Sequence, residues 1–177
     1  MSPERKRRVL IFVEHAYEDL ELWYPKIRLI EEGMEVIVAG PEKMVYPGKN
    51  GYPCRADQTF DEVKADDFDA LVIQGGWAPD KLRRDPRVLD LVRAFDRASK
   101  PIAMICHAGW VPISAGILKG RKATCVSAIK DDVINAGASY SDASVVVDGH
   151  LVSSRTPADL PDFMKALIAL MGAKVPA

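Results

Sequence analysis

The sequence predicts an α/β fold with a mostly parallel central sheet, and two observations carry this prediction. Segments whose apolar residues follow a helical period alternate with short apolar runs rich in β-branched residues, which are typical of strands buried on both faces. These runs are Val9–Val13, Glu35–Ala39, Ala70–Ile73 and Ile102–Ile105. Strands that alternate with helices pair in parallel through right-handed crossovers.

The segments between these strands are assigned in chain order. Leu20–Ile30 has acidic residues in its first turn and apolar residues near helical spacing, so we expect a helix there. Met44–Phe60 is rich in Gly, Pro and Asn, which predicts a loop with one or two short strands and a hairpin around Lys49–Gly51. Arg87–Ser99 begins after one proline and ends before another, and is expected to be a helix.

The last third of the chain continues the alternation with shorter elements. The expected elements are helices over His107–Ala115, Lys130–Ala136 and Ala158–Met171, a strand over Thr124–Val126, and a hairpin of Ser144–Val147 with Leu151–Ser154. Asp148–Gly149 between the last two segments is a strong hairpin-turn signal. We find no repeat and no linker in the 177 residues, so we expect a basic lead-in over 1–8 and one domain over 9–177.

Composition excludes several classes of protein. The 24 Lys and Arg residues balance 25 Asp and Glu residues, so we expect neither a nucleic-acid partner nor an anionic membrane partner. No apolar run is long enough to span a bilayer, and the run after the basic start is too short for a signal peptide. The three cysteines, Cys54, Cys106 and Cys125, lack the spacing of a zinc site or a disulfide framework. We therefore expect a cytoplasmic protein with free thiols and without a metal.

Cys106 is the leading candidate for a catalytic residue. It lies between an apolar strand and the start of a predicted helix, which is the placement of a nucleophile elbow. A helix start stabilises a thiolate, so this placement predicts a lowered pKa for the thiol. The alternative is a buried structural cysteine, which is how we interpret Cys54 and Cys125.

Other polar or flexible positions follow strands at the same edge of the predicted sheet. His107 could act as an acid or base, or its N–H could serve an oxyanion hole, but it could also be a packed histidine. Glu18 could exchange a proton with the thiol or hold it by a hydrogen bond, or it could simply be an acidic residue at a helix start. Gly75–Gly76 allows the backbone to approach a ligand closely, or forms a turn.

Several motifs together resemble the ThiJ/PfpI superfamily, and specifically its PfpI branch of intracellular proteases. The matching segments are Tyr17–Leu22, Phe68–Gly76, Lys100–His107, Ile113–Gly116, Ile129–Gly137, Val152–Arg155 and Pro157–Leu160. The resemblance implies a flavodoxin-like three-layer sandwich with Cys106 at a strained elbow. It also implies a hydrogen bond from Glu18 to the thiol, and an oxyanion pocket around Gly75, Gly76 and His107.

The resemblance further implies a homodimer or homohexamer. In PfpI-type proteins an acidic residue after the Gly-Gly segment of a neighbouring subunit can approach the histidine, and Asp80 matches that position. The family usually has Glu there, and it has smaller or basic residues where this chain has Trp77. Trp77 and Trp110 are expected near the mouth of the pocket, where they would select flat or apolar substrates or pack in an interface.

Three classes of function are consistent with these residues. The first is an enzyme in which Cys106 attacks a carbonyl group, with no organic cofactor. Its substrate is a reactive dicarbonyl such as methylglyoxal, or an adduct of it on proteins, as in the glyoxalase and deglycase activities of the superfamily. The alternative substrate is a peptide or amide bond. The second is a redox or stress sensor in which Cys106 oxidises without turnover. The third is a binding module on the same fold. We favour the small carbonyl substrate, because an aldehyde requires no leaving group to be protonated.

Overall fold

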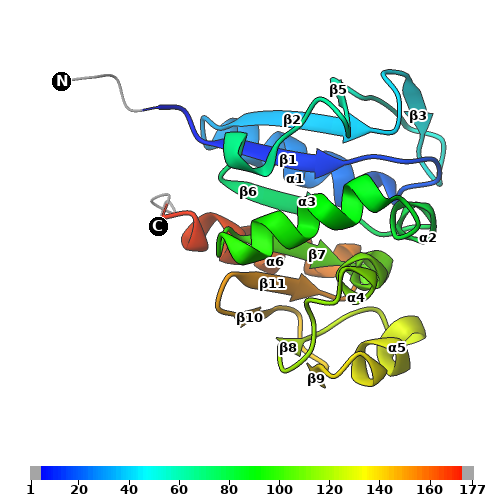
Figure 1. Cartoon of the computed structure of the whole chain (residues 1–177), viewed down its shortest axis with the longest axis vertical. Helices are drawn as coiled ribbons and strands as arrows, with labels where there is room; N and C mark the ends of the chain where they lie inside the picture. The colour runs from blue at the N-terminus through cyan, green and yellow to red at the C-terminus, as the bar shows by residue number, and fades with distance from the viewer. Residues whose placement is uncertain (1–4, 173–177) are drawn as a thin grey trace.

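The computed structural model describes residues 5–172 and has a seven-stranded sheet at its centre (Figure 1). The strand order is β10-β11-β7-β6-β1-β2-β5, and every neighbouring pair is parallel except β10 with β11. In chain order these strands are β1 (Arg8–Phe12), β2 (Glu35–Gly40), β5 (Gln58–Thr59), β6 (Ala70–Ile73), β7 (Ile102–Ile105), β10 (Val146–Asp148) and β11 (Leu151–Ser154). The predicted mostly parallel sheet is confirmed.

Two small sheets lie outside the central one. β3 (Val45–Pro47) and β4 (Pro53–Arg55) form an antiparallel hairpin, as the loop around Lys49–Gly51 predicts. β8 (Lys122–Ala123) pairs in parallel with β9 (Ser139–Tyr140).

Helices cover both faces of the central sheet, which makes the fold a three-layer sandwich (Figure 1). α1 (Asp19–Glu31) and α6 (Leu160–Leu170) contact each other on one face. α3 (Pro86–Arg97) packs on β6 and β7 from the other face, together with α2 (Ala78–Leu82) and α4 (Trp110–Ala115). α5 (Lys130–Asn135) contacts α4 and β9. No helix within residues 5–172 is long and apolar enough to cross a membrane.

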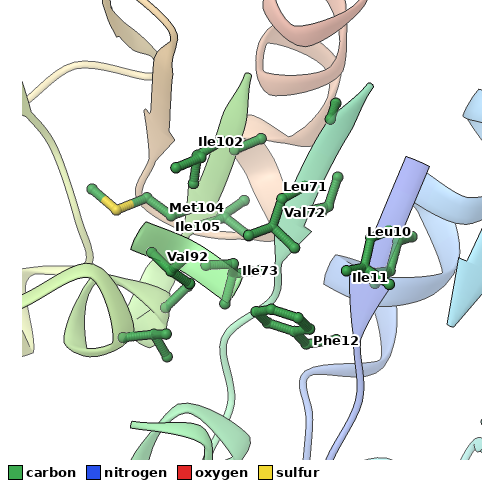
Figure 2. Close-up of a cluster of buried hydrophobic side chains, with 14 of the residues drawn as sticks. Leu10, Ile11, Phe12, Leu71, Val72, Ile73, Val92, Ile102, Met104 and Ile105 are labelled. Atoms are coloured by element: carbon green, nitrogen blue, oxygen red, sulfur yellow. The ribbon is translucent and has the colours of Figure 1, made fainter. Parts of the chain in front are cut away.

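The core lies between the sheet and its helices. β6 and β7 are buried at every position, because a parallel strand with helices on both faces has no solvent side. Figure 2 shows part of this core, and its labelled side chains come from β1, β6, β7 and α3: Leu10, Ile11, Phe12, Leu71, Val72, Ile73, Val92, Ile102, Met104 and Ile105.

Some expected elements have different boundaries or positions. The helix expected over His107–Ala115 begins as a 3₁₀ turn over Cys106–Gly109, and α4 follows it. The strand expected at Thr124–Val126 is wrong, since the strand there is β8; Thr124 N–H instead donates to Ser153 Oγ at 2.9 Å. β1 begins at Arg8, and the outermost parts of the expected lead-in and domain, 1–4 and 173–177, lie outside the described residues.

The strand order places the carboxyl ends of β1, β6 and β7 side by side. After β1 the chain adds β2 on one side and later returns to add β6 on the other, so the order reverses at β1. In open α/β sheets, ligands bind beyond the strand ends at such a reversal. The segments that follow β1, β6 and β7 are therefore the place to look for a site.

Candidate active site

Cys106 follows β7 directly and has a left-handed backbone conformation, with φ at 61°. A non-glycine residue in this region is strained by about 1–3 kcal/mol, and such strain persists where the surrounding structure imposes it. The chain leaves β7 in an extended conformation at Ile105 and turns at once into the 3₁₀ turn. The predicted elbow is therefore present, in a 3₁₀ turn rather than an α-helix.

The thiol of Cys106 has hydrogen-bond partners on two sides. The backbone N–H groups of His107 and Gly76 interact with the sulfur, which favours its thiolate form. The His107 ring lies beside it, with Nδ1 at 3.3 Å from Sγ. A base within this distance can take the proton of the thiol.

Glu21 is the carboxyl group that reaches Cys106. Its side chain is completely buried, its Oε2 accepts a 2.7 Å hydrogen bond from Gly75 N–H, and it forms a hydrogen bond with the thiol. Burial raises the pKa of Glu21 to about 8, against which the hydrogen bonds from Gly75 and Cys106 act. Glu21 therefore carries its proton at neutral pH and can donate a hydrogen bond.

The pKa of the Cys106 thiol is raised to about 12, which contradicts the lowered value expected from its position. Burial of the sulfur is the largest cause and the charge of Glu21 is the next, and together they outweigh the two N–H groups. The four-residue 3₁₀ turn over Cys106–Gly109 is also too short to supply the field of an α-helix. The repulsion from Glu21 disappears when Glu21 is protonated.

Glu18 does not make the contact with the thiol that the family resemblance implies. Its Oε2 lies 3.3 Å from Lys49 Nζ, and its backbone N–H donates to Gly75 O at 3.1 Å. Glu21, one helical turn further along the chain in α1, makes the hydrogen bond to the thiol that was expected of Glu18. Helical spacing could have identified it, because Glu21 shares the buried face of α1 with Leu22, Pro25 and Leu29.

The structure brings Gly75 and Gly76 against the elbow. A Cβ on Gly75 would lie 2.5 Å from Glu21 Oε2 and 2.7 Å from the Cβ of Cys106, so glycine is needed for this approach. Gly76 has φ at 74° and its N–H interacts with the Cys106 sulfur. Both glycines therefore lie beside Cys106, and the oxyanion pocket expected around them stays a prediction.

His107 lies between two tryptophans. Its ring centroid is 5.3 Å from that of Trp77 and 5.2 Å from that of Trp110. Trp110 Nε1 donates to Asp132 at 2.9 Å, while 55% of Trp77 is exposed. Burial lowers the pKa of His107, so its ring is neutral at physiological pH and able to accept a proton.

Asp80 is a second expected site residue that does not contact Cys106 or His107 within residues 5–172. It lies on α2 with an exposed side chain, and its Oδ2 pairs with Arg84 at 3.0 Å. Within one chain it makes no hydrogen bond to His107 among the described residues. An approach to the histidine of a second subunit stays a prediction.

The other cysteines lie away from this chemistry. Cys54 and Cys125 are free and buried, and burial raises the pKa of both thiols. Within residues 5–172, no three His, Cys, Asp or Glu side chains are grouped so that they could hold a metal ion.

A cysteine at a strained strand–turn elbow, with a histidine and a buried glutamate beside it on a parallel sheet, defines a class of α/β proteins with a candidate nucleophile. A family model described as the DJ-1/PfpI family matches residues 7–170, so the chain belongs to this family. The resemblance found in the sequence is confirmed.

Individual relatives agree with this assignment. Deglycase PfpI of Pyrococcus furiosus is 48% identical over 164 residues, covering 93% of this chain and 99% of that protein. The putative cysteine protease YraA of Bacillus subtilis is 39% identical over 169 residues, covering 93% and 98%. A crystal structure of a two-domain protein from Anabaena variabilis, with DJ-1/ThiJ/PfpI-like and ferritin-like domains, matches with a TM-score of 0.94 and 41% identity over 97% of this chain and 50% of that one.

Proposed function

We propose that this protein is a cysteine-dependent enzyme that acts on carbonyl groups, as a deglycase for adducts of reactive dicarbonyls. The observation that carries the proposal is the pairing of Cys106 with Glu21, a nucleophile beside a carboxyl group that holds its proton at neutral pH. The name of the Pyrococcus relative, a deglycase that matches along nearly its whole length, supports the same reaction class.

The proposed chemistry needs no oxidant or reductant. His107 takes the thiol proton, and the sulfur adds to the aldehyde carbon of a 2-oxoaldehyde; the S–C bond forms and the π pair moves to oxygen, which takes a proton. A proton then moves from that carbon to the neighbouring carbonyl carbon, and the hydroxyl proton moves to the neighbouring carbonyl oxygen, which leaves a thioester of a 2-hydroxy acid. Water cleaves the S–C bond and releases the hydroxycarboxylate and the thiol. In an amine adduct, loss of the amine precedes the addition.

Glu21 fits the proton transfers of this scheme. A general acid or base works best when its pKa lies near the working pH, and burial raises the pKa of Glu21 to about 8. Gly75 N–H holds Oε2 in place while the other oxygen of the carboxyl group remains available. Glu21 can therefore give and take a proton without leaving its position.

Cysteine peptidase activity is the second candidate, and the 3.3 Å contact between Cys106 and His107 favours it. Cleavage of an amide requires the departing amine to be protonated, a task for His107 as an acid. The relative named as a putative cysteine protease supports this alternative. Cleavage of a fluorogenic peptide by the wild type but not by Cys106→Ser would favour it over the deglycase.

We also propose that the protein works as a homo-oligomer, a dimer or a hexamer, in a reducing compartment such as the cytoplasm. α1 exposes large apolar side chains, with Leu20 at 58% and Ile27 and Ile30 at 53% each. Leu20 and Ile27 line a hollow of about 450 Å³, together with Asp19, Trp23, Asn50 and Tyr52. Apolar surface of this kind is typical of an interface, and light scattering would give the size of the assembly.

The experiment that tests the deglycase proposal is consumption of methylglyoxal and of its adduct on N-acetyl-lysine, without glutathione or metal. The wild type should release lactate and free amine, and Cys106→Ser and Glu21→Gln should not. Cys125→Ala, which changes a buried thiol outside the site, is the control. Equal turnover by wild type and Cys106→Ser would refute the proposal. No turnover by the wild type, with stoichiometric oxidation of Cys106 by peroxide, would favour the sensor instead.

A further inference from the structure

Lys49 is held at the edge of the Cys106 site by an anchored loop. The loop joins β3 to β4, and Asp19 at the start of α1 accepts hydrogen bonds from the backbone N–H groups of Asn50 and Tyr52, at 2.8 Å each. Lys49 N–H donates to Tyr17 O at 2.7 Å. The position of the Lys49 backbone is therefore fixed relative to the helix that carries Glu18 and Glu21.

The ammonium group of Lys49 is paired but still accessible. Its Nζ lies 3.3 Å from Glu18 Oε2, and the Lys49 side chain is 45% exposed while that of Glu18 is 11% exposed. An ammonium has three N–H donors, and Glu18 is the acceptor it contacts among residues 5–172. Donors remain for a solute that enters from the solvent side.

The Glu18–Lys49 pair borders the reactive sulfur through the two glycines. Glu18 N–H donates to Gly75 O, and Gly75 packs directly on Cys106. The positive charge of Lys49 acts on both neighbours of the sulfur, since it lowers the pKa of Glu21 and of His107. Arg83, a second cation near the site, lies over the Trp110 ring at 5.7 Å and donates to Ser114 Oγ at 2.9 Å.

We propose that Lys49 is a specificity-determining residue that binds the carboxylate of a substrate or product held at Cys106. The choice of ligand rests on the proposed function, because the reaction of a 2-oxoaldehyde ends in a 2-hydroxycarboxylate. Glu18 holds the ammonium in place through one N–H group, and the remaining N–H groups donate to the incoming carboxylate. The site thus prefers carbonyl compounds and products that carry a negative charge at the reacting carbon or next to it.

Two alkylating reagents of nearly equal size test this preference without any turnover. Iodoacetate and iodoacetamide both form an S–C bond to Cys106 with loss of iodide and of the thiol proton, but only iodoacetate carries a carboxylate. The quantity to measure is the ratio of their rate constants at Cys106, by intact mass and peptide mapping. Cys54 and Cys125 are buried and should not react.

The ratio of iodoacetate to iodoacetamide rates should fall about fivefold in Lys49→Gln and recover in Lys49→Arg. It should rise in Glu18→Gln, which frees the ammonium. Lys43→Gln is the matched control, because Lys43 is also a half-exposed lysine paired with a glutamate, Glu62 at 2.7 Å. Its ratio should equal that of the wild type.

Lactate provides a second readout. It should protect Cys106 from iodoacetamide in the wild type and protect it much less in Lys49→Gln. An unchanged reagent ratio in Lys49→Gln would overturn the inference, even if the protein proves to be a deglycase. A changed ratio in a protein that turns over no dicarbonyl would uphold anion binding by Lys49 and refute only the proposed function.

Discussion

Replacing Glu21 by glutamine should remove a pH dependence from the stability of the fold. Burial raises the pKa of Glu21 from 4.5 to about 8, so the folded protein binds this proton more tightly than the unfolded chain does. The contribution of Glu21 to the free energy of unfolding is therefore fully present below pH 4.5, where both states are protonated. This contribution is lost as the pH rises from 4.5 to 8. Glutamine stays neutral throughout this range, and its amide oxygen can still accept the hydrogen bond from Gly75 N–H.

The size of the effect follows from the separation of the two pKa values. Each tenfold difference in proton affinity corresponds to about 1.4 kcal/mol, so the wild type should lose up to about 4 kcal/mol between pH 4.5 and pH 8 through this group. This figure is an upper limit, because water that enters around a charged Glu21 reduces the loss. Against a total stability of about 5–15 kcal/mol, even half of it is easily measured.

Urea unfolding at pH 5, 6.5 and 8 measures this loss. Other titrating groups are common to wild type and Glu21→Gln, so the difference between the two proteins isolates Glu21. The free energy of unfolding of Glu21→Gln should increase steadily relative to that of the wild type as the pH rises. Glu31→Gln changes a largely exposed carboxylate on the same helix. Its free energy of unfolding should depend on pH in the same way as that of the wild type. If the free energy of unfolding of Glu21→Gln had the same pH dependence as that of the wild type, the reasoning that burial keeps this carboxyl group protonated would be refuted.

Four further predictions concern other residues of the chain. Because the pKa of Cys106 is raised, its alkylation by iodoacetamide should speed up about tenfold per pH unit from 6 to 7.5, where Glu21 still holds its proton, and a plateau below pH 7 would contradict this. Gln74→Met should raise the free energy of unfolding by about 1 kcal/mol or more in urea titrations, since both amide atoms of Gln74 are buried without a partner among the described residues; a loss of stability would count against it. Gly75→Ala should abolish turnover, because its Cβ would press on Glu21 and Cys106, and retained wild-type kcat would show that this approach is not needed. Asp80→Ala should lower kcat only in the assembled oligomer; full activity in an intact oligomer would remove Asp80 from the mechanism.

The fold was largely predictable because its strands are short and fully buried. Ala70–Ile73 and Ile102–Ile105 are assigned residue for residue, since continuous apolar runs between glycine or proline signals leave little choice. The segment Thr124–Val126 failed because its backbone groups bond to side chains and loops, as Thr124 does to Ser153, which no periodicity reveals. α2 was missed because five residues are too few for a helical pattern.

The placement of the candidate nucleophile was predictable from the sequence, and the identity of the carboxyl group beside it was less so. Cys106 is marked by its place after a strand, and Gly75 and Gly76 by theirs. Glu18 and Glu21 look equivalent in the sequence, as acidic residues at a helix start. They differ in the direction of their side chains, since Glu21 points into the protein and Glu18 pairs with Lys49. The raised pKa of the thiol depends on burial, which local sequence does not specify.

The contacts of His107 with Trp77 and Trp110 make tryptophan fluorescence a probe of this site. The chain has three tryptophans, and these two contact the imidazole ring. A protonated imidazole accepts an electron from an excited indole and quenches its emission, whereas a neutral ring does so weakly. Stopped-flow fluorescence of the unlabelled protein would therefore follow the proton as it arrives on the histidine and leaves it, within a single catalytic cycle.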